Sequence, residues 1–374
     1  MKEIQQILAA LASAQAGEIV LATLVKVEGS SYRRPGARLL LTADGRRIGS
    51  ISGGCLEDDI IAHAQQVRAS GLPEVFTYDT TSENDLVWGV GLGCQGIVHV
   101  FVERLPLRPA WVAALRENFR RRKPTALAVV WREPAEMRSV RSFPGDATPS
   151  SHVALEPRRG RRGSRTPAAP LAGSQREIAA LGTCLAGDLA SLPSDGVYLQ
   201  TIRPPTALVV FGAGDDVQPL VRFAKELGWH VTVADHRPAF ATPKRFPGAD
   251  ATVVVHAEDA VAGLNPEAGS VAVIMTHNYR NDVRLLGTLL TRPLAYLGLL
   301  GPRKRTDRIL AELEAGGLAI DPGMRGRLRA PVGLDLGADN PEEVALAILA
   351  EMQAVLAGRD ARPLRDRKGP IHAG

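Results

Sequence analysis

The sequence predicts an α/β protein with a C-terminal, Rossmann-like, doubly wound parallel sheet and an N-terminal mixed α+β domain. Two observations predict the parallel sheet. From Thr206 onward, short apolar runs alternate with helical patterns, which is typical of βαβ units. The apolar run 207–211 also leads into Gly212-Ala213-Gly214 and then into a helical pattern, as in a dinucleotide-binding turn.

The period of the apolar residues predicts each C-terminal element. We expect strands over residues 207–211, 230–234, 251–255, 271–275 and 294–299. We expect helices over residues 217–227, 281–290, 302–314 and 341–357. Asn340 and Pro341 suit the N-cap and the first position of the last helix.

The N-terminal elements are mixed in type. We expect helices over residues 2–16, 56–68 and 111–123, and strands over 19–27, 37–41, 46–49, 74–78, 97–102, 125–131 and 197–202. Asp44-Gly45 predicts a hairpin between two of these strands. The chain then divides into a domain over 1–105, a middle segment with an Arg/Pro-rich linker over 106–205, a Rossmann-like domain over 206–357 and a basic tail over 358–374.

The composition is that of an ordinary globular protein. Of the 374 residues, 45% are hydrophobic and 23% charged, and the formal net charge is +5. Much of the positive excess lies in arginine-rich stretches, and we expect residues 134–174 to be a disordered or loosely held insertion. No aromatic interleaving or zinc-finger spacing accompanies the arginines, so we expect no nucleic-acid partner.

The cysteine usage and the apolar patterning indicate the compartment. The chain has three cysteines, Cys55, Cys94 and Cys184, an odd and low number that argues against a disulfide framework and favours a reducing cytosol. The N-terminus lacks the continuous apolar core of a signal peptide, and no apolar run reaches the length of a membrane span. We expect a cytoplasmic protein with no membrane partner.

The stretch 49–57 contains Gly53-Gly54-Cys55 at a predicted strand-to-helix turn. Glycines let backbone N–H groups approach a ligand closely. The helix start adds unpaired donors and the positive end of a dipole, and a thiol placed there tends towards thiolate. We expect this turn to be a binding site.

A second glycine-cysteine turn, residues 89–96, contains Cys94. Cys55 and Cys94 can serve as two arms of one soft-metal or sulfur site. A buried, inert cysteine at each turn is the alternative, and the acidic run 57–59 disfavours a thiolate beside Cys55. We expect Cys184 to be structural.

The turn after residue 211 has the features of a nucleotide site. Gly212 and Gly214 occupy the first two glycine positions, and Asp235 ends the next strand, where a ribose-binding acid is expected. The domain therefore either binds a nucleotide or is a purely structural Rossmann layer.

Other residues of the same turn oppose nucleotide binding. Val217 occupies the third glycine position, and the carboxylates of Asp215 and Asp216 would repel a pyrophosphate. Pro219 would disturb the first turns of the helix.

Two further polar loops follow apolar strands at the carboxyl edge of the predicted sheet, where such folds bind ligands. His277 follows the run 271–275 and can act as a ligand or an acid/base group. Arg303, Lys304 and Arg305 stand at a helix start, which suits an anion. The alternative for both loops is helix capping and solvated charge.

Taken in order, these motifs resemble the XdhC/CoxI family, the xanthine dehydrogenase accessory proteins of molybdenum cofactor maturation. The resemblance covers about residues 5–105 and 200–357. It rests on residues 50–57, 93–96, 208–214, 235–238, 275–279, 297–301 and 331–338.

The resemblance implies a chaperone without turnover of its own. It would bind the molybdenum cofactor (molybdopterin), protect it while a cysteine desulfurase or sulfurase installs the sulfido ligand, and deliver it to an apo molybdenum hydroxylase of the xanthine dehydrogenase type. It also favours a homodimer. The cofactor-binding residues would be Gly53, Gly54, Cys55, Cys94, Gly212, Gly214, Asp235, His277 and Arg303, with Cys55 and Cys94 as the metal ligands.

Two other functions stay open at this point. The Rossmann turn and Asp235 also suit an NAD(P)-dependent oxidoreductase, although the N-terminal domain offers no recognisable hydride-acceptor pocket. A cofactor-free adaptor that links the hydroxylase to the sulfurase is the other.

Overall fold

The computed structural model describes residues 1–13, 19–79, 96–131, 182–186 and 196–368. The chain divides into two compact units, one of residues 6–204 and one of residues 1–5 and 205–374. Each unit is described by itself. Cys94, and with it the second glycine-cysteine turn up to Gln95, lies outside the described residues, as does the arginine-rich segment 134–174.

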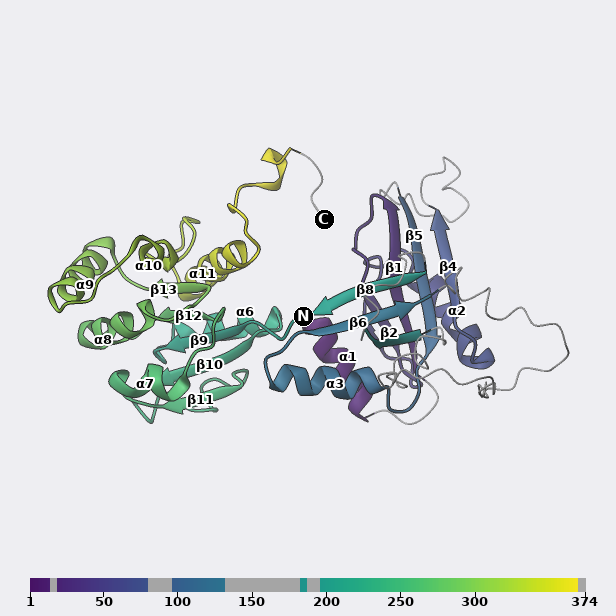
Figure 1. The fold of residues 1–374 in the computed structure, drawn as a ribbon, viewed down its shortest axis with the longest axis horizontal. Helices are drawn as coiled ribbons and strands as arrows, with labels where there is room; N and C mark the ends of the chain where they lie inside the picture. The colour runs from purple at the N-terminus through teal and green to yellow at the C-terminus, as the bar shows by residue number, and fades with distance from the viewer. Residues whose placement is uncertain (14–18, 80–95, 132–181, 187–195, 369–374) are drawn as a thin grey trace, which may run out of the picture. The chain divides into compact units, whose positions relative to one another are not determined.

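The C-terminal unit is built on a six-stranded parallel sheet with the order β11-β10-β9-β12-β13-β14 (Figure 1). The strands are β9 (Ala207–Phe211), β10 (His230–Asp235), β11 (Ala251–Val254), β12 (Val271–Ile274), β13 (Tyr296–Leu299) and β14 (Leu328–Arg329). The strand order reverses between β9 and β12, which makes this point the topological switch of the sheet. The predicted doubly wound parallel sheet is confirmed.

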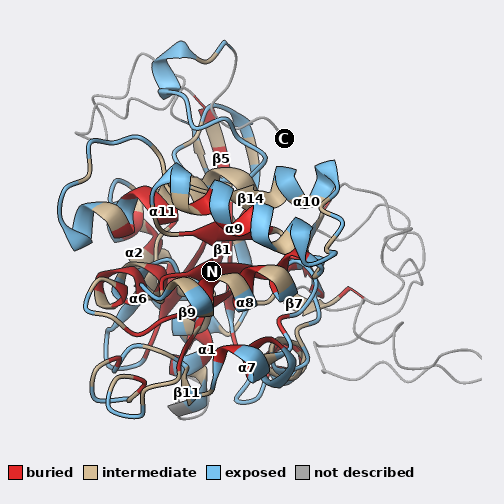
Figure 2. Cartoon of the chain, turned by 90° about the vertical axis from the view of Figure 1, so that its left-hand side faces the viewer, coloured by how far each residue is buried: buried red, intermediate tan, exposed pale blue. Residues whose placement is uncertain are grey.

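Helices cover both faces of this sheet. On one face lie α6 (Val217–Glu226) and α11 (Pro341–Leu356), and on the other lie α7 (Ala257–Leu264), α8 (Tyr279–Leu290) and α9 (Arg303–Ala315). Leu208 and Val210 of β9 pack in the first core and Val209 and Phe211 in the second, because successive side chains of a strand point to opposite faces. Figure 2 shows the central strands largely buried and the outer surface of the short α10 (Pro322–Arg327) exposed.

Local capping explains where several of these helices begin. The Asn340 side chain accepts a hydrogen bond from the Glu343 N–H at 3.0 Å, which confirms the predicted cap of α11.

The expectation that Pro219 disturbs α6 is wrong. Pro219 is the third residue of α6 and is buried, and an N–H in the first turn has no intrahelical acceptor to lose.

The N-terminal unit contains a five-stranded antiparallel sheet with the order β3-β2-β1-β5-β4. Its strands are β1 (Val20–Gly29), β2 (Arg38–Leu41), β3 (Arg47–Gly49), β4 (Glu74–Asp79) and β5 (Gly96–Arg104). The β2–β3 pairing confirms the predicted hairpin. One face of the sheet packs against α2 (Glu57–Ser70), and α1 (Lys2–Ser13) opens the chain.

A second, three-stranded antiparallel sheet completes this unit, with the order β7-β6-β8. It consists of β6 (Thr125–Val130), β7 (Gly182–Leu185) and β8 (Val197–Ile202), and α3 (Ala110–Arg120) precedes it. Phe101 of β5 and Val129 of β6 share one buried cluster, which joins the two sheets. β7 was not among the strands predicted from the sequence, and it is defined here by its pairing with β6. Cys184 lies half-buried on β7, paired with Ala128.

Candidate functional site at the carboxyl edge of the parallel sheet

The turn that follows β9 needs glycine at its first position. Gly212 has φ +120°, and a Cβ built on it would lie 2.2 Å from the Met275 carbonyl oxygen. Its N–H donates to the Ala234 carbonyl at 2.8 Å. The turn is therefore packed between the end of β10 and the residue that follows β12, at the edge where Rossmann folds bind ligands.

Asp235, the predicted ribose-binding acid, is buried at this edge. Its carboxylate accepts hydrogen bonds from the Ala213 N–H at 2.8 Å, and from the backbone N–H and guanidinium of Arg237 at 2.8 to 2.9 Å. Burial alone would raise the pKa of Asp235, but these donors outweigh it and lower that pKa. The acceptor positions that a ribose would use are therefore taken by the protein itself.

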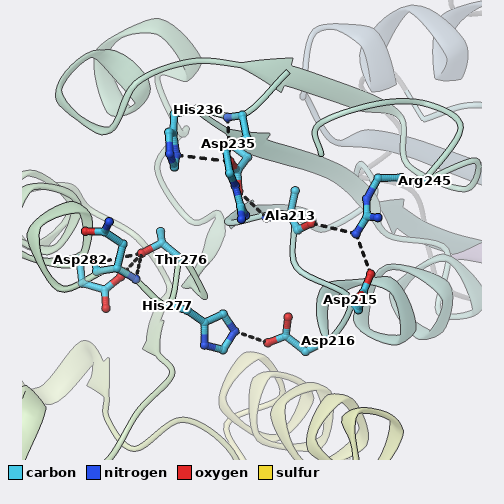
Figure 3. Close-up of polar contacts among 11 residues, drawn as sticks. Ala213, Asp215, Asp216, Asp235, His236, Arg245, Thr276, His277 and Asp282 are labelled. Carbon is cyan, nitrogen blue, oxygen red and sulfur yellow. Dashed lines mark hydrogen bonds and ion pairs between the residues drawn. The ribbon is translucent and has the colours of Figure 1, made fainter. Parts of the chain in front are cut away.

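The two carboxylates that were expected to repel a pyrophosphate each have a partner (Figure 3). Asp215 accepts from the Arg245 guanidinium at 2.7 Å, and this guanidinium also reaches the Ala213 carbonyl at 3.3 Å. Asp216 Oδ2 lies 2.8 Å from Nε2 of His277. Each carboxylate of the turn therefore has a partner from a later loop, a guanidinium for Asp215 and an imidazole for Asp216.

His277 follows β12 and has an unusual backbone. Its φ is +53°, a left-handed conformation that costs a residue with a Cβ about 1 kcal/mol or more. The loop is held by the Asn278 N–H, which donates to Thr276 Oγ1 at 3.1 Å, while the Thr276 hydroxyl contacts the carboxylate of Asp282. The imidazole is 62% exposed, so the loop presents it at the edge of the sheet.

Arg305, rather than the predicted Arg303, carries the organised positive charge of α9. Its guanidinium contacts Asp282, whose residue is only 1% exposed, through Nε at 3.1 Å and through Nη2. Its Cζ also lies 5.6 Å from the ring centre of Tyr279. Arg303 is exposed at the first position of α9.

A pocket of about 400 Å³ opens at the carboxyl ends of β12, β13 and β14. It is lined by His277, Leu300, Gly301, Pro302, Arg305, Pro331 and Val332. Most of this lining is apolar, with two nitrogen-bearing side chains from separate loops, which is typical of a small-molecule site. Across the Gly212 turn, a cavity of only about 20 Å³ lies beside Asp235 and His236.

The glycine turn of the N-terminal unit differs from the expectation. Four of its backbone N–H groups are not open to a ligand. The side chain of Glu57, the first residue of α2, folds back and accepts their hydrogen bonds. The Glu57 carboxylate accepts from the backbone N–H groups of Ile51, Ser52, Gly53 and Gly54 at 2.7 to 3.2 Å. The turn is thus a nest for an anion, and its anion is the protein's own carboxylate.

The charge state of Glu57 follows from these contacts. Its residue is 8% exposed, and burial alone would raise its pKa. The side chain and backbone of Ser52 and the hydroxyl of Ser50 donate to the carboxylate, as does the Ile51 N–H, and together they lower the pKa of Glu57 to about 2. Glu57 is therefore an ionised, structural part of the turn.

Cys55 lies on this turn and is exposed, so the alternative of a buried, inert cysteine is wrong at this position. Within the described ranges, no group of three or more His, Cys, Asp or Glu side chains is arranged to hold a metal ion. Because Cys94 lies outside those ranges, a site shared by Cys55 and Cys94 stays a prediction.

The described helices also bear on the membrane expectation. None of them combines the length and the apolar character that crossing a bilayer requires.

The fold and the edge pocket define a two-unit α/β protein with a Rossmann-type C-terminal domain. The model of the XdhC Rossmann domain matches residues 208–352, and the model of the XdhC and CoxI family matches residues 12–79. The chain belongs to the XdhC and CoxI family, as the motifs predicted.

Relatives extend this similarity over nearly the whole chain. The chain is 34% identical over 339 residues to a protein of Bacillus subtilis named as a probable xanthine dehydrogenase subunit, covering 90% of this chain and 92% of that protein. It is 22% identical over 336 residues to the molybdenum cofactor insertion chaperone PaoD of Escherichia coli, covering 90% and 83%. The crystal structure of a xanthine dehydrogenase from Bacillus halodurans matches with a TM-score of 0.70 and 28% identity, over 96% of this chain and 97% of that chain.

Proposed function

We propose that the protein is a molybdenum cofactor chaperone for a molybdenum hydroxylase of the xanthine dehydrogenase type. It holds the cofactor while a sulfurase installs the sulfido ligand, delivers it to the apo-hydroxylase, and performs no turnover itself. The observation that carries the proposal is the similarity over 90% of the chain to a relative named as a molybdenum cofactor insertion chaperone. The Bacillus subtilis relative, whose name refers to xanthine dehydrogenase, supports the choice of client.

The chemistry of the carboxyl edge of the parallel sheet supports the molybdenum cofactor as the ligand. The cofactor is bulky and anionic and carries a pterin ring, so it needs a pocket with apolar walls and a few fixed donors. The 400 Å³ pocket with His277 and Arg305 offers both. We propose that the cofactor binds at this edge, next to four of the predicted residues: Gly212, Gly214, His277 and Arg303. Asp235 stabilises the edge through its hydrogen bonds with Ala213 and Arg237.

In the N-terminal unit, the exposed thiol of Cys55 suits a soft metal or a sulfur ligand. We propose that Cys55, together with Cys94, forms the metal-ligating site of the N-terminal unit. The role of Gly53 and Gly54 is then to place Cys55 rather than to donate hydrogen bonds, because their N–H groups already bind Glu57.

The same geometry argues against a nicotinamide-dependent oxidoreductase. Such an enzyme needs the acid at the end of the second strand to accept hydrogen bonds from the adenosine ribose. Four donors from Ala213 and Arg237 already occupy the Asp235 carboxylate.

The test is to purify the full chain from cells that make the molybdenum cofactor and from cells that lack pterin synthesis. We expect molybdenum and pterin to co-purify only from the first, and the loaded protein to activate a purified apo-hydroxylase. Protein that captures the apo-hydroxylase but carries neither molybdenum nor pterin would instead be the cofactor-free adaptor. Homodimer formation is measured on the same samples by light scattering.

A further inference from the structure

The carboxyl edge of the parallel sheet is open on one side of the Gly212 turn and closed on the other. On the side of β12, β13 and β14 the pocket measures about 400 Å³. On the side of β10 and β11 the cavity measures about 20 Å³, which is room for about one water molecule. The two cavities therefore differ in the size of the ligand that each can hold.

Beside the small cavity, arginine side chains already occupy the carboxylates of Asp235 and Asp215. The Arg237 guanidinium lies on the carboxylate of Asp235, and its Cζ stacks 3.9 Å from the ring centre of Phe240. Arg245 stacks on the same ring at 4.8 Å and binds Asp215. The Arg237 guanidinium thus takes the carboxylate that would bind a nucleotide's ribose in a Rossmann fold.

On the open side, each basic group at the pocket has an acidic partner. His277 is paired with Asp216 at 2.8 Å, and Arg305 is paired with the buried Asp282. Each pair holds its nitrogen-bearing group in place, and Asp282 offsets the charge of Arg305. The pocket lining therefore presents two oriented nitrogen groups that already have carboxylate partners, which favours an uncharged polar ligand over a free anion.

The remaining pocket lining is apolar and braced. Leu300, Pro302, Pro331 and Val332 supply aliphatic surface. The loop after Val332 is fixed because Glu351 of α11 accepts hydrogen bonds from the Gly333 N–H at 2.9 Å and from the Tyr296 hydroxyl at 2.6 Å. Rigid apolar walls with a few nitrogen groups suit a planar heterocycle that has polar atoms on its edge.

We propose that this pocket binds the pterin ring of the cofactor, and that the closed side excludes a nucleotide. The inference rests on the proposed function for the identity of the heterocycle. The pocket, the ion pairs and the size difference between the two sides are properties of the chain itself. His277 and Arg305 contact the polar edge of the ring, and Asp216 and Asp282 act as positioning residues.

The test is a fluorescence titration of the full chain at pH 7 with 6-hydroxymethylpterin, a fluorescent pterin without a carboxylate, and a parallel titration with NAD⁺. His277→Asn removes the imidazole and keeps a residue that tolerates the left-handed backbone. We expect it to weaken pterin binding about tenfold. The matched control is His236→Asn at the closed side, for which we expect no change. Val332→Trp, checked for folding by its thermal transition, fills the pocket and should abolish binding.

Three results would overturn the inference: unchanged pterin affinity in both His277→Asn and folded Val332→Trp, weaker binding in His236→Asn, or NAD⁺ binding that competes with the pterin. The two proposals fail separately. If molybdenum co-purifies equally with the wild type and with both pocket variants, the pocket is not the pterin site, but the chaperone function still stands. If pterin binding requires His277 but the protein never carries molybdenum, the pocket is a pterin site and the chaperone function is wrong.

Discussion

The imidazole Nε2 of His277 lies 2.8 Å from Oδ2 of Asp216, and this contact joins the loop after β12 to the turn after β9. From the sequence, His277 was expected to be a ligand or an acid/base group, and Asp216 a charge that repels a pyrophosphate. In the structure the carboxylate holds an imidazole whose backbone is left-handed, with φ +53°. The pair therefore sets one wall of the edge pocket.

Removing the carboxylate of this pair should loosen the pocket without unfolding the unit. We expect Asp216→Ala to weaken the binding of 6-hydroxymethylpterin about three- to tenfold, because a hydrogen bond makes a net contribution of about 0.5 to 1.5 kcal/mol. Asp215→Ala is the matched control, since its carboxylate is 84% exposed and pairs with Arg245 rather than with His277. Equal affinities in the two variants, measured by fluorescence titration, would show that the Asp216 contact does not position the imidazole.

The Glu57 carboxylate should stabilise the N-terminal unit in a pH-dependent way. The pKa of Glu57 is lowered from 4.5 to about 2, so the folded state favours the ionised form. Its contribution is fully present above pH 4.5 and is lost as the pH falls towards 2. We expect Glu57→Gln to lower the free energy of unfolding by about 2 to 3 kcal/mol at pH 7, and by progressively less below pH 4.5.

The matched control for Glu57 is Asp58→Asn, which neutralises the neighbouring carboxylate. The Asp58 side chain is 90% exposed and pairs with Arg47 at 3.2 Å, so we expect a change below about 0.5 kcal/mol. Urea unfolding at pH 7, 5 and 3.5 measures both variants. A destabilisation by Glu57→Gln that stays constant over this pH range would contradict the ionised-carboxylate account.

The Gly212 turn should not accept a side chain. A Cβ at Gly212 would lie 2.2 Å from the Met275 carbonyl oxygen, on a backbone with φ +120°. We expect Gly212→Ala to destabilise the C-terminal unit by about 3 kcal/mol or more, because both a clash and a strained backbone act. Gly263→Ala is the control, because Gly263 is helical and a Cβ there meets nothing within 4 Å. It should be neutral or stabilise by up to about 1 kcal/mol.

Thermal unfolding compares the two glycine variants directly. The expected order of transition temperatures is Gly212→Ala below the wild type and Gly263→Ala at or above it. A Gly212→Ala protein as stable as the wild type would mean that the turn can move away from the carboxyl end of β12.

The exposed thiol of Cys55 should matter for cargo and not for folding. Cys55 is exposed on a turn held by Glu57, so we expect Cys55→Ala to unfold like the wild type while the molybdenum that co-purifies with it falls several-fold. Cys184→Ala, a change at a half-buried position on β7, should leave the molybdenum content unchanged. Normal molybdenum content in Cys55→Ala would remove Cys55 from the cofactor site.

Much of the architecture could be predicted from local sequence signals. The glycine turn after β9, the Asn340 cap and the Asp44-Gly45 hairpin each depend on a few neighbouring residues, and the structure contains all three. Two short strands, β7 and β14, were not predicted. They exist through pairing with β6 and β13.

The candidate site could be predicted only in its location. The expectation that polar loops gather at the carboxyl edge follows from strand direction alone, and His277 lies there. The choice of Arg303 over Arg305 depended on which way each side chain leaves the first turn of α9. That direction follows from the packing of the helix, which brings Arg305 to the buried Asp282.

The amino-acid sequence by itself determined the fold class, the family and the edge at which a ligand can bind, because these depend on periodicity, glycine placement and strand order. Only the tertiary structure decided which donors and acceptors remain open there. Glu57 closes the glycine turn of the N-terminal unit, and Arg237 closes the carboxylate of Asp235. Such pairings depend on the final positions of side chains, which are settled when the elements pack together.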